Sequence, residues 1–250
     1  MGAPLAASLI HSGIIAAFAV ALALPALFRP ARAYVVLVAA LAFVDVFATV
    51  WPSFSGTPLH VIGAYWNWNG KLVDFVVLAL VAALFVLTGL FTRQELGATF
   101  TQRPGAWRAV LFVMAPLLVL DAFAVWKLAP HEALNAEKIA YELTMPGLAE
   151  ELCYRGLLLA LFERMFVSTK TILGAKVGYG AIATSLLFAA DHTISVNQAL
   201  HVSFDPGSAA FPLVIGFLLV WIRARSGSLV LPVVFHNILN AISSIVPAFG

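Results

Sequence analysis

A series of apolar runs, each about as long as a bilayer is thick, constrains this chain more than any other feature. A helix needs about 20 apolar residues to cross a bilayer. Each segment in lipid must satisfy its own backbone hydrogen bonds, and the short alternating segments of a membrane barrel are missing from the sequence. The sequence therefore predicts an all-α, polytopic membrane helix bundle of about eight transmembrane helices. The predicted spans are 5–28, 33–54, 72–91, 107–128, 138–161, 177–193, 209–224 and 228–248.

The composition supports lipid as the main partner of this chain. Hydrophobic residues make up 62% of the sequence and charged residues only 10%, whereas soluble domains carry roughly 25% charged residues. The net charge is +2 without any basic block, which argues against nucleic acid as a partner. We expect a single membrane domain over 1–250, with four helices in 1–130 and four helices that carry the chemistry in 138–248. The run 5–28 lacks a preceding basic segment, so we interpret it as a retained helix.

The basic residues alternate between successive loops and so predict an orientation. One set of loops holds ten of them: Arg29, Arg32, Arg93, Arg103, Arg108, Arg164, Lys170, Lys176, Arg223 and Arg225. The opposite loops hold three: Lys71, Lys127 and Lys138. This bias places both termini outside the cytoplasm, with the segment 193–209 at an outward-facing mouth. The alanine-rich composition leads us to expect the cytoplasmic membrane of a bacterium.

The fifth span carries charges at a depth where charges are costly. Glu150, Glu151 and Arg155 fall near its middle, and such residues usually pair, line a cavity or perform chemistry. Glu151 and Arg155 are four residues apart and share a helical face, whereas Glu150 is turned from Glu151 by about 100°. Pro146 removes one backbone hydrogen bond just before them. The sequence thus predicts one fixed ion pair and one free carboxylate, with a purely structural ion pair as the simpler alternative.

The sixth and eighth spans add neutral polar groups. Phe188 and His192 are four residues apart, as are His236 and Asn240, so each pair shares a helical face. A single histidine in a membrane helix is more often a packed, hydrogen-bonded side chain than a catalyst. Two histidines and an asparagine together with a glutamate pair supply a base, a proton carrier and hydrogen-bond donors. Their depths along the helices, at 1.5 Å per residue, would let Glu150, His192, His236 and Asn240 meet if the three helices are neighbours.

Other candidates point to structure more than to chemistry. Asp45, Asp74 and Asp121 lie in or near apolar spans, and we interpret them as buried hydrogen-bonding or interface residues. Cys153 lacks a base four residues away and is expected to pack. Neither a Gly-x-Ser-x-Gly nor a His-Glu-x-x-His motif occurs in the sequence. A serine nucleophile elbow and a helix-borne zinc site of the second type are therefore excluded.

Taken together, the polar residues of these helices resemble the CPBP family, which comprises the CAAX proteases and bacteriocin-processing enzymes and is also called the Abi family. The resemblance covers about 138–245 and includes Arg-Gly after the first motif. In the order of the family, the motifs here are Glu150-Glu151-x-x-x-Arg155, Phe188-x-x-x-His192 and His236-x-x-x-Asn240.

The resemblance implies an eight-helix bundle with an internal polar cavity and an intramembrane endopeptidase activity. Glu150 and His192 would activate a water molecule, and His236 and Asn240 would donate hydrogen bonds to the developing oxyanion. Hydrolysis of a peptide bond needs such a base and such donors. The substrate would be a peptide or a membrane-anchored protein. The remaining motif residues are Phe188 and the two that would orient the site, Glu151 and Arg155.

Two questions stay open at the level of the sequence. The family has been described both as glutamic proteases and as metalloproteases, and Glu150, His192 and His236 are residue types that hold zinc. Since none of these ligands are closely spaced, we favour a site without a cofactor. The alternative functions are a proton-coupled transporter, which often shows inverted repeats, and a non-catalytic immunity or scaffold protein.

Overall fold

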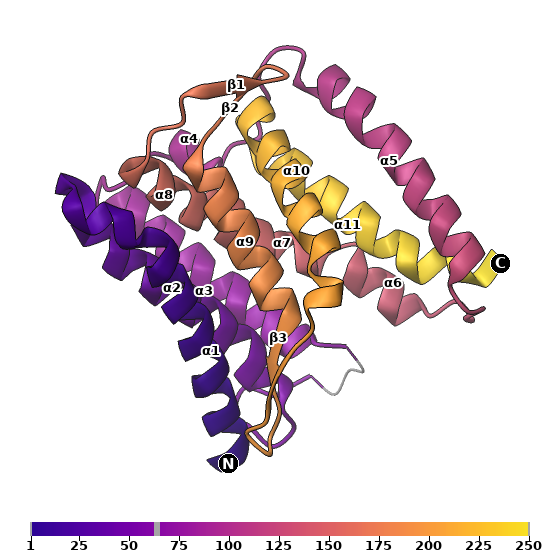
Figure 1. Cartoon of the computed structure of the whole chain (residues 1–250). Coiled ribbons are helices and arrows are strands. Elements are labelled where there is room, and N and C mark those ends of the chain that lie inside the picture. Colours follow the sequence, from indigo (N-terminus) through magenta and orange to yellow (C-terminus); the bar gives the residue numbers. More distant parts are fainter. Residues whose placement is uncertain (1, 63–65, 250) are drawn as a thin grey trace.

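The computed structural model of the chain describes residues 2–62 and 66–249. Within these residues, six helical stretches are long and apolar enough to cross a membrane. The predicted all-α membrane bundle is thus confirmed (Figure 1). The six stretches are Gly2–Phe28, Pro30–Ser53, Trp68–Leu87, Ala106–Leu128, Pro206–Ser226 and Val230–Phe249. They contain the helices α1 (Gly2–Ala23), α2 (Ala33–Val50), α3 (Trp68–Leu87), α5 (Ala106–Leu128), α10 (Ala210–Ser226) and α11 (Val230–Ile245). Short 3-10 turns extend several of them, at η1 (Leu24–Phe28), η2 (Pro30–Arg32), η3 (Trp51–Ser53), η5 (Pro206–Ser208) and η6 (Val246–Phe249).

The fifth predicted span is broken, and the expected start at residue 138 is wrong. A separate short helix, α6 (Ala136–Glu142), is followed by a turn, and the next helix begins only at Met145. The break lies just before Pro146, because proline has no N–H to continue the hydrogen bonding of α6 and fits the first turn of a new helix. From Met145 the chain runs through α7 (Met145–Glu151), a π-helical segment η4 (Leu152–Leu158) and α8 (Leu159–Met165). The remaining short helix is α4 (Arg93–Leu96).

The sixth predicted span is a helix, α9 (Tyr179–Thr193), of 15 residues. At a rise of 1.5 Å per residue it is about 22 Å long, shorter than a hydrocarbon core of about 30 Å. Much of its surface is covered by neighbours, since it packs against α1, α8, α10 and η4. A short helix fits here because protein, rather than lipid, surrounds much of it.

Two antiparallel hairpins flank α9. β1 (Lys170–Ile172) pairs with β2 (Ala175–Val177), and β3 (Ile194–Val196) pairs with β4 (Val202–Phe204). The β3–β4 hairpin occupies the segment predicted to form an outward-facing mouth. The two hairpins lie toward opposite ends of the bundle, and the N-terminus lies at the β3 end (Figure 1).

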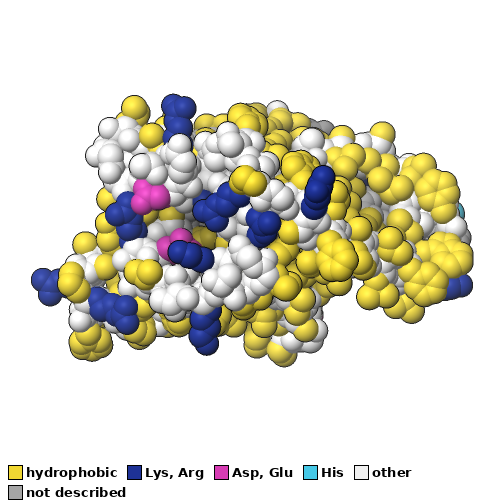
Figure 2. Space-filling model, turned by 90° about the horizontal axis from the view of Figure 1, so that it is seen from above, with side chains coloured by type: hydrophobic (Ala, Val, Ile, Leu, Met, Phe, Trp, Pro, Cys, Tyr) yellow, Lys and Arg dark blue, Asp and Glu magenta, His cyan; other side chains and the backbone are white. Residues whose placement is uncertain are grey.

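Lys and Arg side chains gather at the end of the molecule that carries β1 and β2 (Figure 2). Loops that are distant in sequence meet there, because Arg103 N donates to Ser226 O over 2.8 Å and Arg103 Nη1 donates to Ala224 O over 2.7 Å. Arg164 pairs with Glu95 over 2.5 Å on the same side. Loops grouped by their basic residues thus come together in space, which agrees with the alternation read from the sequence.

Two apolar cores hold the bundle together. One joins α1, α2 and α3 to η4, α8 and α9 through residues such as Leu78, Leu158 and Phe162. The other joins α5, α10 and α11 through residues such as Val110 and Phe235. α7 contacts both α3 and α11, so its polar side chains lie between the two cores.

Candidate active site

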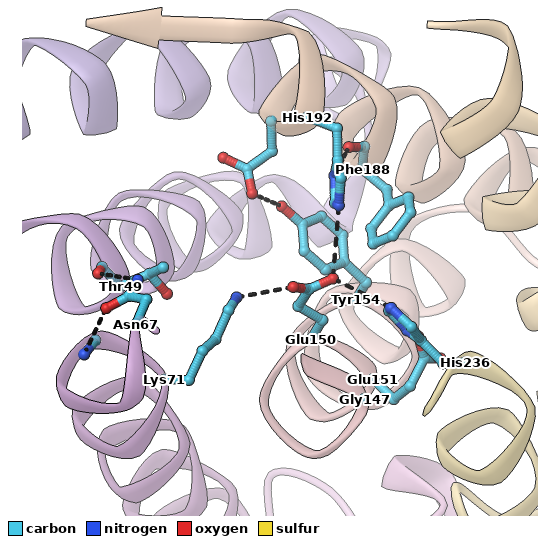
Figure 3. A network of polar contacts seen from close by, with 12 residues as sticks. Thr49, Asn67, Lys71, Gly147, Glu150, Glu151, Tyr154, Phe188, His192 and His236 are labelled. Atoms are coloured by element: carbon cyan, nitrogen blue, oxygen red, sulfur yellow. Dashed lines mark hydrogen bonds and ion pairs between the residues drawn. The ribbon is translucent and has the colours of Figure 1, made fainter. Parts of the chain in front are cut away.

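Glu150 on α7 forms an ion pair with Lys71, which the apolar runs of the sequence place in a loop. Lys71 Nζ lies 2.8 Å from Glu150 Oε1, and the two side chains are only 12% and 10% exposed (Figure 3). The prediction that Lys71 belongs to an outer loop is wrong. α3 begins at Trp68, four residues before the predicted start at residue 72, and this places Lys71 in its first turn.

The second oxygen of Glu150 faces two histidines. Glu150 Oε2 is buried without a hydrogen-bond partner, and it lies 3.8 Å from His192 Nε2 and 3.6 Å from His236 Nε2. These distances are longer than a hydrogen bond. α9 and α11 therefore bring both histidines to the same oxygen but leave a gap between them and the carboxylate.

Each histidine is oriented through its other ring nitrogen. His192 Nδ1 lies 2.8 Å from the Phe188 carbonyl oxygen. Because a carbonyl only accepts, Nδ1 carries the proton, and Nε2 of the neutral ring is left as an acceptor. His236 Nδ1 lies 2.7 Å from Glu151 Oε1 and likewise donates.

Glu151 and Arg155 form the predicted ion pair. Arg155 Nη1 donates to Glu151 Oε1 over 2.9 Å, and neither side chain is exposed. Arg155 Nη2 donates to Gly216 O on α10 over 3.2 Å, and the guanidinium lies 4.3 Å from the centroid of the Phe188 ring. The pair lies where α7 passes into the π-helical η4, a type of segment that occurs frequently at functional sites.

α7 is fixed against α11 by Asn237, which belongs to none of the three sequence motifs. Gly147 N donates to Asn237 Oδ1 over 2.8 Å, and Asn237 Nδ2 donates to Thr144 O over 3.3 Å. Asn237 thus binds the Gly147 N–H, one of the first amides of α7 that have no partner within the helix, and shares Thr144 O with Leu148 N, which donates to it over 3.4 Å. No motif indicates this role, since it depends on how the two helices cross.

Asn240, on α11, lines a pocket beside the site. A cavity of about 260 Å³ opens beside the two histidines, between α9, α10 and α11. Its polar lining is His192, Ser208, His236 and Asn240, and its apolar lining is Phe188, Phe211, Pro212, Ile215 and Leu239. A mainly apolar pocket with a few convergent polar groups is typical of a ligand site.

A second buried polar group adjoins the site on the side of α1, α2 and α3. Tyr154 Oη donates to Asp191 Oδ2 over 3.1 Å, and His11 Nε2 lies 3.9 Å from Asp191 Oδ1. Asp45 and Asp74 are buried, as the sequence predicted. The Tyr154 ring also packs edge-on against Phe188, with centroids 5.2 Å apart. Tyr154, held by Asp191, thus supports the Phe188 ring, which packs against the His192 ring.

The site has donor types of a zinc centre but not its arrangement. A catalytic zinc site commonly uses three protein ligands and an open position, and Glu150, His192 and His236 offer such atoms. In the part of the chain that the structure describes, no group of three or more His, Cys, Asp or Glu side chains is arranged to hold a metal ion. Lys71 also places a cation 2.8 Å from Glu150, where it would repel a metal. As they lie in this structure, these residues are therefore not arranged as a zinc site.

The structure brings together all seven motif residues, contributed by α7, η4, α9 and α11: Glu150, Glu151, Arg155, Phe188, His192, His236 and Asn240. It adds Lys71 and Asn237. The sequence indicates a further cation only through its charges. Two acids beside a single arginine leave a buried negative charge without a counterion, and Lys71 supplies that counterion.

The fold and the site define a helical membrane protein with a buried glutamate–histidine centre. Residues 135–242 match the family model described as Type II CAAX prenyl endopeptidase Rce1-like. This match confirms the resemblance carried by the three motifs: over these residues the chain is similar to the CAAX protease family. A family of this description implies a protease. No curated protein and no solved structure matches the chain significantly.

Proposed function

We propose that this chain is an intramembrane endopeptidase in which Glu150 and His192 activate a water molecule. The proposal rests on two hydrogen-bond acceptors that lie close to each other. Glu150 Oε2 is buried without a hydrogen-bond partner, and His192 Nε2, 3.8 Å away, points a lone pair toward it. A water molecule beside both atoms would donate one hydrogen to each, with its oxygen free to attack a carbonyl.

The proposed reaction assigns a role to each polar group. Glu150 takes a proton as the water oxygen attacks the scissile carbonyl carbon, and this proton then passes to the leaving amine as the C–N bond breaks. His236, held by Glu151 through Nδ1, and Asn240 face the oxyanion from the same pocket, and Asn240 donates to it from its amide. Donors fixed in advance at the developing charge supply a large part of the rate enhancement in such reactions.

The pocket supports a peptide or a membrane-anchored protein as the substrate. Its wall opposite the histidines is apolar and lies near the start of α10, where Phe211 and Ile215 line it. An apolar wall stabilises an extended segment that carries an apolar side chain or a lipid, because it removes that surface from water. We propose the cytoplasmic membrane of a bacterium as its location and a mechanism without a metal.

The test is cleavage by the full-length protein of an internally quenched peptide that carries a prenylated CAAX sequence, with its unprenylated twin in parallel. Glu150→Gln should lower kcat about 10²- to 10⁴-fold, the usual contribution of general base catalysis. Its thermal unfolding midpoint shows whether the variant is folded. Glu132→Gln is the matched control, since Glu132 is an exposed carboxylate outside the site that pairs with Lys138.

Two outcomes overturn this proposal. One is cleavage by folded Glu150→Gln at the rate of the unmodified protein. The other is the absence of cleavage of both peptides by the unmodified protein.

A further inference from the structure

Among residues 2–62 and 66–249, Lys71 is the one partner of Glu150 that comes from outside the region shared with the family. It lies on α3, whereas the family match begins at residue 135. Its ammonium is 2.8 Å from Glu150 Oε1, a distance typical of a charge-assisted hydrogen bond. The side chain is only 12% exposed. A buried lysine with this contact is part of the site and not of the surface.

Lys71 completes the charge balance at the centre of the bundle. Without it, Glu150 and Glu151 would face Arg155 alone, and one buried negative charge would lack a counterion. A charge left unpaired in such surroundings costs several kcal/mol. With Lys71 there are two ion pairs, since Arg155 pairs with Glu151 over 2.9 Å and Lys71 with Glu150 over 2.8 Å. The carboxylate of Glu150 is therefore stabilised in its charged form, which is the form that accepts a proton.

The start of α3 is built so that Lys71 reaches Glu150. Asn67 caps the helix by accepting from Gly70 N over 2.9 Å, and its Nδ2 donates to Thr49 O at the end of α2 over 3.1 Å (Figure 3). Gly70 packs so closely against α2 that a Cβ there would overlap the Thr49 carbonyl oxygen. This glycine and its cap fix the position and direction of the first turn, and Lys71 is the next residue.

We propose that Lys71 is a positioning residue that holds Glu150 by Oε1 and so directs Oε2 toward His192 and the attacking water. The proposal rests on the proposed peptidase function. A carboxylate has two equivalent oxygens and rotates freely unless one is bound. The other contacts of Glu150, to His192 and His236, are 3.8 and 3.6 Å long and too loose to orient it. The orientation of Glu150 on α7 therefore depends on the position of α3, which carries Lys71.

The test compares Lys71→Met, Lys71→Arg and Lys127→Met in the full-length protein with the prenylated quenched peptide. Methionine keeps the length and apolar stem of lysine but removes the charge, and arginine restores a cation. Lys127 is the control, because it is a lysine near the end of α5 that lies over the Trp126 ring, 4.0 Å from its centroid, and outside the site. Lys71→Met should lower kcat about 10²-fold with KM nearly unchanged, as expected when a reacting group loses its orientation. Lys71→Arg should recover part of the rate, and Lys127→Met should equal the unmodified protein.

A thermal double-mutant cycle with Glu150→Gln tests the ion pair without any substrate. If the pair exists, the losses of Lys71→Met and Glu150→Gln are not additive, and the double variant unfolds at a higher temperature than the sum of the single effects predicts. Additive losses, or Lys71→Met with an unchanged kcat in a protein whose cleavage depends on Glu150, overturn the role of Lys71. Absence of cleavage by the unmodified protein overturns the peptidase proposal instead, so the two failures are distinct.

Discussion

The first three helices of the chain and the helices that carry the site differ in length and in regularity. α1, α2 and α3 are 22, 18 and 20 residues long, and each belongs to an apolar stretch long enough to span. In the second half the run from Met145 to Met165 changes to a π-helix midway, and α9 has only 15 residues. The first three helices are long and regular enough to cross the bilayer, whereas these irregular or short helices of the second half carry side chains of the site.

The difference follows from where each set keeps its polar groups. A polar group facing hydrocarbon costs several kcal/mol unless it has a partner. Glu150, Glu151 and Arg155 avoid most of this cost because protein groups surround and pair with them, and Glu151 and Arg155 are fully enclosed. The apolar helices provide that enclosure, and a helix within it is free to be short or irregular. Asp45, Asp74 and Lys71 are exceptions in the first half, and of these Lys71 forms an ion pair with Glu150 of the polar centre.

The largest effect we expect is an all-or-none difference in labelling between the two ends of the bundle. Single cysteines at Ser55 in the first half and Ser203 in β4 should react with an impermeant thiol reagent on intact cells, in a Cys153→Ser background. Both positions are exposed and lie in segments predicted to be outside the cytoplasm. A cysteine at Thr169, exposed next to β1, should react only after the membrane is opened.

This experiment shows whether the two halves share one orientation. Labelling of Ser203→Cys only in opened membranes would refute the predicted topology and turn the pocket toward the cytoplasm. Opposite results for Ser55→Cys and Ser203→Cys would show that the loop charges place only one of the halves correctly.

The next largest effect concerns a buried charge of the second half. Arg155→Ala should lower the free energy of unfolding by about 3–5 kcal/mol, because Glu151 is left buried without its counterion. Arg32→Ala is the control from the first half, since Arg32 is exposed, and its effect should stay within about 0.5 kcal/mol. Titration with a denaturing detergent, followed by circular dichroism, measures both.

The reason given for the loss is itself testable. Glu151→Gln combined with Arg155→Met removes both charges and should restore part of the lost stability. If this pair of substitutions is as harmful as the sum of the single ones, the enclosure of a charge is not what limits stability there.

A smaller effect is expected from the same substitution in the two halves. A Cβ on Gly147 would overlap Asn237 Oδ1 and lie 3.0 Å from Val233 O, whereas a Cβ on Gly13 would meet nothing within 4 Å. Gly147→Ala should therefore cost about 1–3 kcal/mol through overpacking. Gly13→Ala should stabilise α1 by up to about 1 kcal/mol, since alanine is the better helix former. Equal effects in the two unfolding curves would mean that α7 and α11 are not tightly fitted.

The sequence predicts the site better than it predicts the helices that carry it. The spacing of Glu151 and Arg155 forecasts their ion pair, since four residues are one turn of a helix. It does not forecast the π-helix after Glu151, whereas the turn before Pro146 has a cause in the sequence, since proline has no N–H to continue the preceding helix. Lys71 was misplaced by a shift of four residues in the start of a helix. An apolar run does not mark that start, but the Asn67 cap, which holds Gly70 N, does.

The smallest effect we expect is that of removing metal. If Lys71 from the first half supplies the positive charge that stabilises Glu150, the second half needs no metal ion for this purpose. Exhaustive chelation should then leave cleavage of the prenylated peptide unchanged, and elemental analysis of the active protein should find less than stoichiometric zinc. Cleavage lost on chelation and restored by zinc would show that Glu150, His192 and His236 rearrange into a ligand set with an open position. Lys71→Met separates these mechanisms further: in a zinc site it should tighten metal binding, because it removes a cation that lies 2.8 Å from Glu150, whereas in the metal-free site it should only slow the reaction.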